Sequence, residues 1–282
     1  MMEKYRLYAF ADEADKMMDG QIAAMKRNKL QGLEIRNVEG TNVSRITVEK
    51  AKEVRQKMDD NGLVTWSVGS PIGKVKLENW EEHAERLRHT LEIANILGAE
   101  NLRMFSFFME QEDIPNHTQE VIDKLGAFLD IAKGSGVWLC HENEKGIYGA
   151  TAESCLAIHK ALPQLKGIFD PANFVQCGVD TAKAWDMLHS YTYYLHIKDA
   201  LPDGNVVPSG KGVGNVARIV KSYLAAGGKH MTIEPHLTVF DGLAALEEKG
   251  DTSKIGQYTY PSKDAAFDVA CNAIKGILRE VL

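Results

Sequence analysis

Four successive apolar segments in the second half of the chain each end in a side chain that can bind a metal ion or carry a proton. These side chains are Glu142, Asp170, His196 and Glu234. Three carboxylates and one imidazole suit a hard or borderline divalent ion such as Mn²⁺ or Mg²⁺, and they suit structural zinc poorly. Carboxylates gathered at one point would repel one another at low dielectric unless a cation neutralised them. The residue types therefore predict one divalent-metal site, provided that the fold brings the four segments together.

The elements that would position these residues alternate regularly along the chain. Strand-like apolar runs are predicted at 6–10, 32–35, 64–68, 101–105, 137–141, 167–170, 193–198 and 230–234. Helices are predicted at 21–28, 48–60, 80–97, 119–135, 152–161, 182–188, 217–226 and 263–282. About eight strand–helix units of roughly 35 residues are the repeat of a (β/α)8 barrel. We therefore expect an α/β fold, a single-domain TIM barrel over residues 1–282.

An open doubly wound sheet is the competing fold. Such a sheet usually carries a glycine-rich phosphate-binding turn after its first strand, whereas here Ala11-Asp12-Glu13-Ala14-Asp15 follows the first run. No linker or low-complexity stretch divides the sequence, which also favours one barrel. The longest irregular stretch, Leu237 to Ser262, follows the eighth run and is expected to lie over the barrel mouth.

Strand geometry predicts which side chains face the barrel interior. Functional groups of such barrels lie at the C-terminal ends of the strands, and successive side chains of a strand point to opposite faces. Because apolar Ile233 should face the helices, Glu234 and His236 should face the mouth, and the same alternation places His196 and Lys198 inward. Each residue alone has an ordinary explanation as a cap, a turn or a core histidine. Their joint occurrence on four strands favours a shared site.

Composition excludes several classes of protein. The formal net charge is −6 and the sequence pI is about 5.9, which disfavours a protein built to bind nucleic acid. No apolar run reaches the roughly 18–20 residues of a membrane span, and the N-terminal residues lack the apolar core of a secretory signal. The scattered cysteines suggest reduced thiols and a cytoplasmic protein; they are Cys140, Cys155, Cys177 and Cys271.

The strand-end motifs resemble the sugar phosphate isomerase/epimerase family of xylose isomerase-like barrels. The resemblance covers nearly the whole chain and rests on Glu142-Asn143, Phe169-Asp170-Pro171-Ala172-Asn173, His196-Ile197-Lys198-Asp199, Gly210-Lys211-Gly212-Val213-Gly214 and Ile233-Glu234-Pro235-His236. In that family the matching glutamate, aspartate, histidine and glutamate bind one divalent metal ion, often manganese. The resemblance thus implies a metal bound by Glu142, Asp170, His196 and Glu234, with magnesium, cobalt or zinc as alternatives to manganese.

One departure separates the chain from a nuclease branch of these barrels. The endonuclease IV type carries a histidine three residues after the sixth-strand aspartate and holds several zinc ions. This chain has Asn173 at that position, and no histidine lies in 66–71 or 103–108. We therefore expect no multi-zinc site and no nucleic-acid partner.

The predicted activity is metal-dependent isomerisation or epimerisation of a sugar or sugar phosphate. A metal ion chelated by a carbonyl and the adjacent hydroxyl acidifies the C–H between them and stabilises an enediolate. Glu142 and Glu234, on opposite flanks of the ligand set, are the candidate acid/base pair, as the resemblance also implies. The alternative is a dehydratase of the inosose or dehydroshikimate type, which then expels a hydroxyl. A barrel that only binds a carbohydrate or a partner is the third hypothesis.

Five further residues are candidates for contacts with a small sugar or polyol-like substrate: Lys198, His236, Glu34, Arg103 and Asn173. Structural roles compete with these. Lys198 could instead form a salt bridge to a site carboxylate, His236 could support Glu234, and Glu34 could pair with Arg36. A homo-oligomer is compatible with such a barrel, although no sequence patch identifies an interface.

Overall fold

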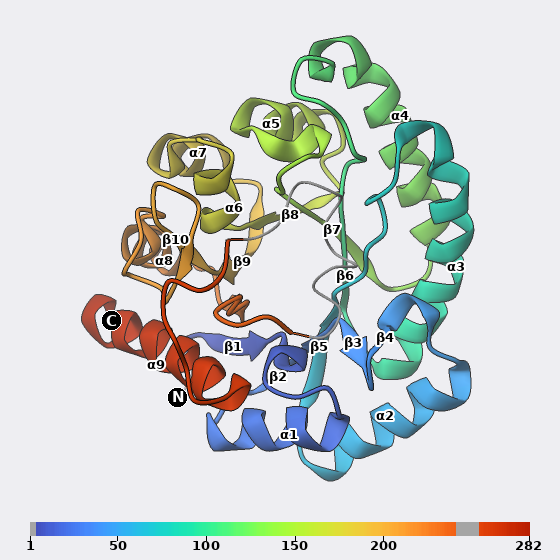
Figure 1. The fold of residues 1–282 in the computed structure, drawn as a ribbon. Helices are drawn as coiled ribbons and strands as arrows, with labels where there is room; N and C mark the ends of the chain where they lie inside the picture. The colour runs from blue at the N-terminus through green and yellow to red at the C-terminus, as the bar shows by residue number, and fades with distance from the viewer. Residues whose placement is uncertain (1–3, 241–253) are drawn as a thin grey trace.

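A computed structural model describes residues 4–240 and 254–282, and a closed parallel barrel forms its centre (Figure 1). The eight strands are β1 (Arg6–Ala9), β2 (Gly32–Ile35), β5 (Val64–Val68), β6 (Asn101–Met104), β7 (Trp138–Glu142), β8 (Lys166–Phe169), β9 (Thr192–Ile197) and β12 (His230–Ile233). Their order around the barrel is β1-β12-β9-β8-β7-β6-β5-β2, so the last strand pairs with the first. The predicted TIM barrel is confirmed.

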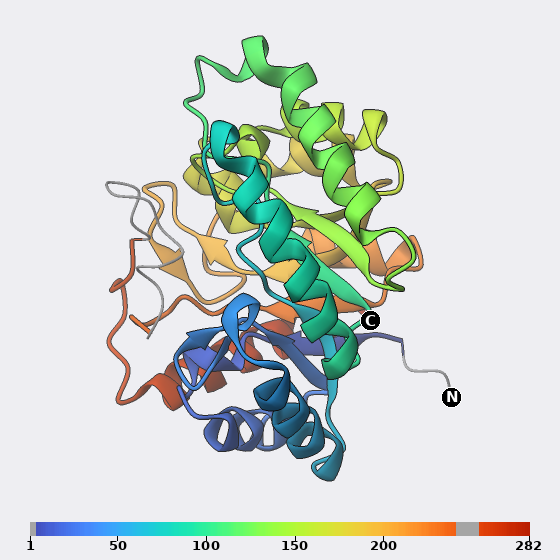
Figure 2. The same ribbon diagram turned by 90° about the vertical axis from the view of Figure 1, so that its right-hand side faces the viewer.

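Helices surround the strands and complete the alternating pattern. They are α1 (Met18–Arg27), α2 (Val48–Asp60), α3 (Trp80–Leu97), α4 (Ile114–Ala132), α5 (Ala152–Ala161), α6 (Pro171–Gln176), α7 (Thr181–Leu188), α8 (Val216–Ala225) and α9 (Lys263–Val281). Figure 2 shows α3 and α4 side by side across the outside of the strands. The last helix, α9, packs against α8 and α1 and closes the helical ring. Within the described ranges, no helix combines the length and apolar character needed to cross a bilayer.

Local sequence signals set several helix ends, and where they are weak the predicted bounds differ. Thr47 Oγ1 accepts a hydrogen bond from Lys50 N (3.1 Å) at the start of α2, and Gly98, with a φ of +72°, ends α3. The helix expected from residue 119 begins five residues earlier, because Pro115 is tolerated in a first turn whose N–H groups have no partner within the helix. Helix α1 likewise begins before the predicted residue 21.

Aromatic side chains fill the N-terminal half of the barrel interior. The Trp66 ring stacks on Tyr8 (4.9 Å between centroids) and on His230 (4.0 Å), with Tyr194 edge-on at 5.8 Å. A separate, larger apolar core lies between the strands and the helices. Since these rings occupy the N-terminal half of the interior, inward-facing polar groups gather at the C-terminal end of the strands.

The irregular stretch predicted over the mouth is described only at its two ends, because residues 241–253 lie outside the described ranges. Phe240 is buried and its ring stacks on His236, with 5.3 Å between centroids. The described beginning of this stretch therefore lies against the site end of the barrel, as expected.

The glycine loop Gly210–Gly214, which follows β11 (Val206–Val207), wraps around the buried carboxylate of Asp199 in β10 (Asp199–Ala200). Asp199 Oδ2 accepts hydrogen bonds from Gly210 N (2.9 Å) and Gly212 N (3.0 Å). Its Oδ1 accepts from Gly214 N and Ala200 N, both at 2.9 Å. A Cβ atom on Gly212 would collide with the Ala200 carbonyl oxygen and with Asp199, so the close approach requires glycine. Asp199 is therefore the anchor of this loop.

Replacing Asp199 by alanine should lower the free energy of unfolding by about 3–5 kcal/mol, because four N–H groups lose an anionic acceptor. Urea unfolding followed by circular dichroism measures this change. The matched control is Asp203→Ala, since the exposed Asp203 carboxylate accepts hydrogen bonds from Asn205 within its own turn. Equal, small effects of the two substitutions would show that the loop does not depend on Asp199.

Candidate metal centre

The four predicted ligands converge at the C-terminal end of four neighbouring strands. Glu142 ends β7, Asp170 follows β8, His196 lies in β9 and Glu234 follows β12. Each of the four side chains offers one ligand atom, and these atoms all lie within 4.8 Å of one another. All four residues are buried. For His196 and Glu234, strand alternation placed the side chain on the correct face of the barrel.

Asp170 is held by the chain on both sides. Its Oδ1 caps α6 by accepting a hydrogen bond from Asn173 N (2.9 Å). The Asn143 side chain accepts from Asp170 N (2.8 Å) and donates to Asp170 O (2.9 Å), which ties the ends of β7 and β8 together. Oδ2 is left buried, 3.0 Å from Lys198 Nζ, but it accepts no well-oriented hydrogen bond from the described residues. This oxygen is available to a further cation.

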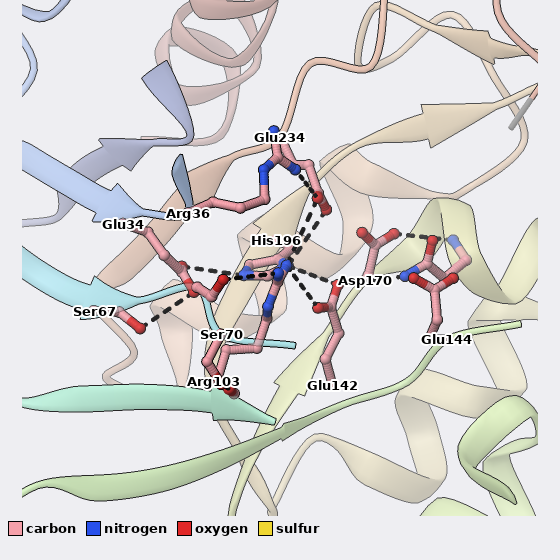
Figure 3. Close-up of polar contacts among 12 residues, drawn as sticks. Glu34, Arg36, Ser67, Ser70, Arg103, Glu142, Glu144, Asp170, His196 and Glu234 are labelled. Atoms are coloured by element: carbon pink, nitrogen blue, oxygen red, sulfur yellow. Dashed lines mark hydrogen bonds and ion pairs between the residues drawn. The ribbon is translucent and has the colours of Figure 1, made fainter. Parts of the chain in front are cut away.

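His196 lies between carboxylates on two sides (Figure 3). Its Nε2 is 3.2 Å from Glu34 Oε2, while Nδ1 is 2.8 Å from Glu142 Oε1 and 3.5 Å from Glu234 Oε2. Burial lowers the pKa of His196, but Glu142 and Glu34 outweigh burial and hold the pKa well above its usual range. Glu34 holds the ring at Nε2, and Nδ1 is the nitrogen that faces the other candidate ligands.

Three buried cations balance part of the negative charge. Arg103 Nη1 is 3.2 Å from Glu142 Oε2, Arg36 Nη1 is 3.2 Å from Glu234 Oε1, and Lys198 Nζ is 3.0 Å from Glu234 Oε2. Each of the two glutamates therefore has one oxygen bound by an arginine. The other oxygen of each glutamate faces His196 Nδ1.

The pKa values of the acids show that this compensation is uneven. Burial, reinforced by Glu234 and Glu142, raises the pKa of Asp170 to about 7 in spite of Lys198. Burial also acts to raise the pKa of Glu234, but Lys198 and other neighbouring groups outweigh it and hold that pKa well below its usual range. Of these two carboxylates, Asp170 is the one that the protein's own cations neutralise less.

The donor set fits a divalent metal ion. Three carboxylates and one imidazole nitrogen lie within coordinating reach of a common point, and Asp170 Oδ2 is buried without a well-oriented hydrogen bond. Oxygen-rich ligation with one nitrogen suits manganese or magnesium and accommodates other divalent ions. The residues that would hold the ion are Glu142, Asp170, His196 and Glu234.

The five predicted substrate contacts all lie in or beside this cluster. Lys198 forms the salt bridges to Asp170 and Glu234 that were its alternative role. His236 Nε2 lies 3.5 Å from Glu234 Oε1. Asn173 Nδ2 donates to Glu142 Oε1 (3.3 Å).

The side chains of Arg103 and Glu34 also form contacts with neighbouring groups. The ion pair of Arg103 with Glu142 engages one of its terminal nitrogens, and the other donates to the Gly69 carbonyl. The expected alternative in which Glu34 pairs with Arg36 is wrong. Glu34 contacts His196, because β2 directs its side chain across the barrel interior toward β9.

Two acidic residues of this end of the barrel, Asp12 and Glu13, were not predicted. They follow β1 in a 3₁₀ turn and bind Arg36: Asp12 through two bonds of 2.9 and 3.0 Å, and Glu13 through one of 3.0 Å. Burial, with Asp12 and Glu234 nearby, raises the pKa of Glu13 to about 8 against the attraction of Arg36. Their position directly after a barrel strand was the signal that could have identified them.

A closed parallel barrel with an acid–imidazole cluster at its C-terminal end defines the class as a TIM barrel with a candidate metal centre. The sequence profile of the xylose isomerase-like TIM barrel family matches residues 22–245, and the chain belongs to this family. No curated protein matches the sequence significantly.

Three solved structures illustrate the likeness of the fold. The IolI protein with a bound zinc atom has a TM-score of 0.77 at 13% identity, covering 98% of this chain and 99% of that one. The D-psicose 3-epimerase of Clostridium cellulolyticum H10, with D-tagatose, has a TM-score of 0.72 at 12% identity, covering 98% and 99%. The probable 3-DHS dehydratase AsbF of Bacillus anthracis has a TM-score of 0.72 at 13% identity, covering 96% and 98%. At these identities the likeness establishes the fold alone.

Proposed function

We propose that the protein is a divalent-metal-dependent isomerase or epimerase of a sugar or sugar phosphate. The observation that carries this proposal is the buried cluster of Glu142, Asp170, His196 and Glu234, whose ligand atoms lie within 4.8 Å of one another. Membership of the xylose isomerase-like family supports it, as does the epimerase among the barrels of similar fold.

The same four residues would hold the ion, for which we propose manganese, with magnesium, cobalt or zinc as alternatives. A divalent ion at this place supplies Lewis-acid polarisation of a substrate carbonyl and so lowers the pKa of the neighbouring C–H group. Aromatic packing below the cluster excludes water from one side of the site.

Glu142 and Glu234 are proposed to move the proton. They come from the two outer strands of the ligand set, so they can approach a substrate carbon from opposite sides. Arg103 holds one oxygen of Glu142, and Arg36 holds one oxygen of Glu234. Each glutamate would bind the ion through one oxygen and exchange the proton through the other, so that one glutamate accepts a proton from the carbon and the other returns one.

The remaining site residues are proposed to bind or orient the substrate. Lys198 Nζ, 3.0 Å from both Asp170 and Glu234, is the ammonium best placed to donate to a substrate oxygen. Arg103 lies beside Glu142 and His236 lies beside Glu234, and both are proposed to contact the substrate from these positions. Glu34 and Asn173 would contribute chiefly by orienting His196 and Glu142.

Elemental analysis and hydrogen exchange test the proposal together. We expect about one divalent ion per chain. In heavy water, a panel of ketoses and ketose phosphates should include one that gains deuterium at the carbon next to the carbonyl without losing water. A new enone absorbance would identify the dehydratase reaction instead. A protein with neither bound metal nor exchange on any member of the panel would contradict the proposal.

A further inference from the structure

A second group of ligand-type side chains lies beside the candidate metal centre, and a guanidinium already occupies it. Glu13, Glu234 and His236 offer ligand atoms within 4.8 Å of one another. Arg36 Nη2 is 3.0 Å from Glu13 Oε1, and Arg36 Nη1 is 3.2 Å from Glu234 Oε1 and 3.4 Å from His236 Nε2. The cation of this second group is therefore a side chain of the protein itself.

Arg36 is fixed in this place from every direction. Asp12 accepts hydrogen bonds from Nε (2.9 Å) and Nη2 (3.0 Å), which holds the guanidinium in one plane. The rings of Phe10 and Phe240 lie 4.6 and 4.3 Å from the guanidinium carbon, so aromatic faces contact the flat cation. The residue is only 1% exposed. Since a guanidinium does not lose its proton in proteins, Arg36 is a permanent cation here.

The ligand-type groups around Arg36 are arranged by the backbone as well. Glu13 Oε2 accepts a hydrogen bond from His236 N (2.6 Å), at a residue whose φ of +44° is unusual for a side chain other than glycine. A guanidinium nitrogen only donates, so His236 Nε2 directs its lone pair at Arg36. An imidazole lone pair and two carboxylates thus face one point, which is the donor arrangement of a metal site.

We propose that Arg36 takes the place of a second divalent ion, filling the group formed by Glu13, Glu234 and His236 and so limiting the protein to one bound ion. Glu234 is shared by the two groups. With Oε1 bound by Arg36, Glu234 presents only Oε2 to the first site. The count of one ion in the native protein rests on the proposed function, whereas the second group rests on the contacts of Arg36.

The test is to remove the guanidinium and count metal ions. For the Arg36→Ala protein, titration with Mn²⁺ followed by elemental analysis should give two ions per chain, against one in the native protein. Because Glu234 would bridge the two ions, the electron paramagnetic resonance spectrum should change from that of isolated Mn²⁺ to that of a spin-coupled pair. Arg36→Lys, which keeps a cation, should bind one ion.

The double variant Glu13→Gln/Arg36→Ala tests where the second ion binds, because it also removes the Glu13 carboxylate from the second group. This variant should bind one ion per chain. A second ion that persists in the double variant would lie elsewhere and overturn the inference. So would an Arg36→Ala protein that binds no more Mn²⁺ than the native protein, or one that fails to fold both with and without the metal.

These outcomes separate the inference from the proposed function. A native protein without bound metal, together with an Arg36→Ala protein that binds one ion dependent on Glu13, would contradict the proposed function and support the role of Arg36. The reverse pattern, one ion in both proteins, would leave the proposed function standing and refute this inference.

Discussion

Replacing Glu142 or Glu234 by glutamine should slow deuterium exchange on the responsive ketose by about 10²–10⁴-fold, the usual contribution of a positioned general acid or base. Glutamine keeps the size and shape of the side chain but can neither accept the proton nor supply the negative charge. Both glutamates are buried among the groups that would surround the substrate. Proton nuclear magnetic resonance measures the exchange rate directly.

The metal content of the same variants separates the two roles proposed for each glutamate. A variant that keeps its ion and loses exchange has lost the acid or base, whereas a variant that loses both has lost a ligand. Glu153→Gln is the matched control. Glu153 lies exposed in the first turn of α5, so this substitution makes the same chemical change outside the site. Exchange within about threefold of the native rate in both site variants would refute the acid/base assignment.

The fold was predictable because hydrophobic periodicity and end signals agree over most of the chain. β2, β5, α2, α3 and α5 begin and end at the predicted residues. Short elements carry too few residues to show a period, and several were missed: the hairpins β3 (Asn37–Val38) with β4 (Thr41–Asn42) and β10 with β11 (Val206–Val207), and the six-residue helix α6. These pieces depend on contacts with the barrel rather than on their own sequence pattern.

The candidate site, like the fold, could be predicted from the sequence only in part. Strand alternation alone placed Glu234 and His196 toward the mouth, because the flanking apolar residues must face the helices. The association of Arg36 with Asp12 and Glu13 has no such local signal. It arises because barrel closure sets β1 between β2 and β12, which brings residues 12, 36 and 234 together. Sequence could indicate which groups face inward, but the pairing of charges depends on the three-dimensional arrangement of the strands.

Replacing Lys198 by methionine should destabilise the metal-free protein by about 3–5 kcal/mol, the usual cost of removing one partner from a buried ion pair. Lys198 Nζ is 3.0 Å from both Asp170 Oδ2 and Glu234 Oε2, and the side chain is only 3% exposed. Its loss leaves Asp170 Oδ2 without this cation and removes one of the cations that balance Glu234. A divalent ion bound by the same carboxylates would restore the missing charge, so saturating Mn²⁺ should reduce the loss by more than half. Urea unfolding in excess chelator and in excess Mn²⁺ measures both values.

Lys183→Met is the control for this experiment, because Lys183 is 84% exposed and its nitrogen lies 3.9 Å from Asp180. Exposed ion pairs of this kind contribute little, so this variant should match the native protein under both conditions. The difference between Lys198→Met and Lys183→Met then measures the effect of the buried position of Lys198, separately from the loss of a lysine in general. An equal destabilisation of Lys198→Met with and without Mn²⁺ would mean that the ion does not bind beside Asp170 and Glu234. In that case the charge that Lys198 balances and the charge that the metal balances would belong to different places in the barrel.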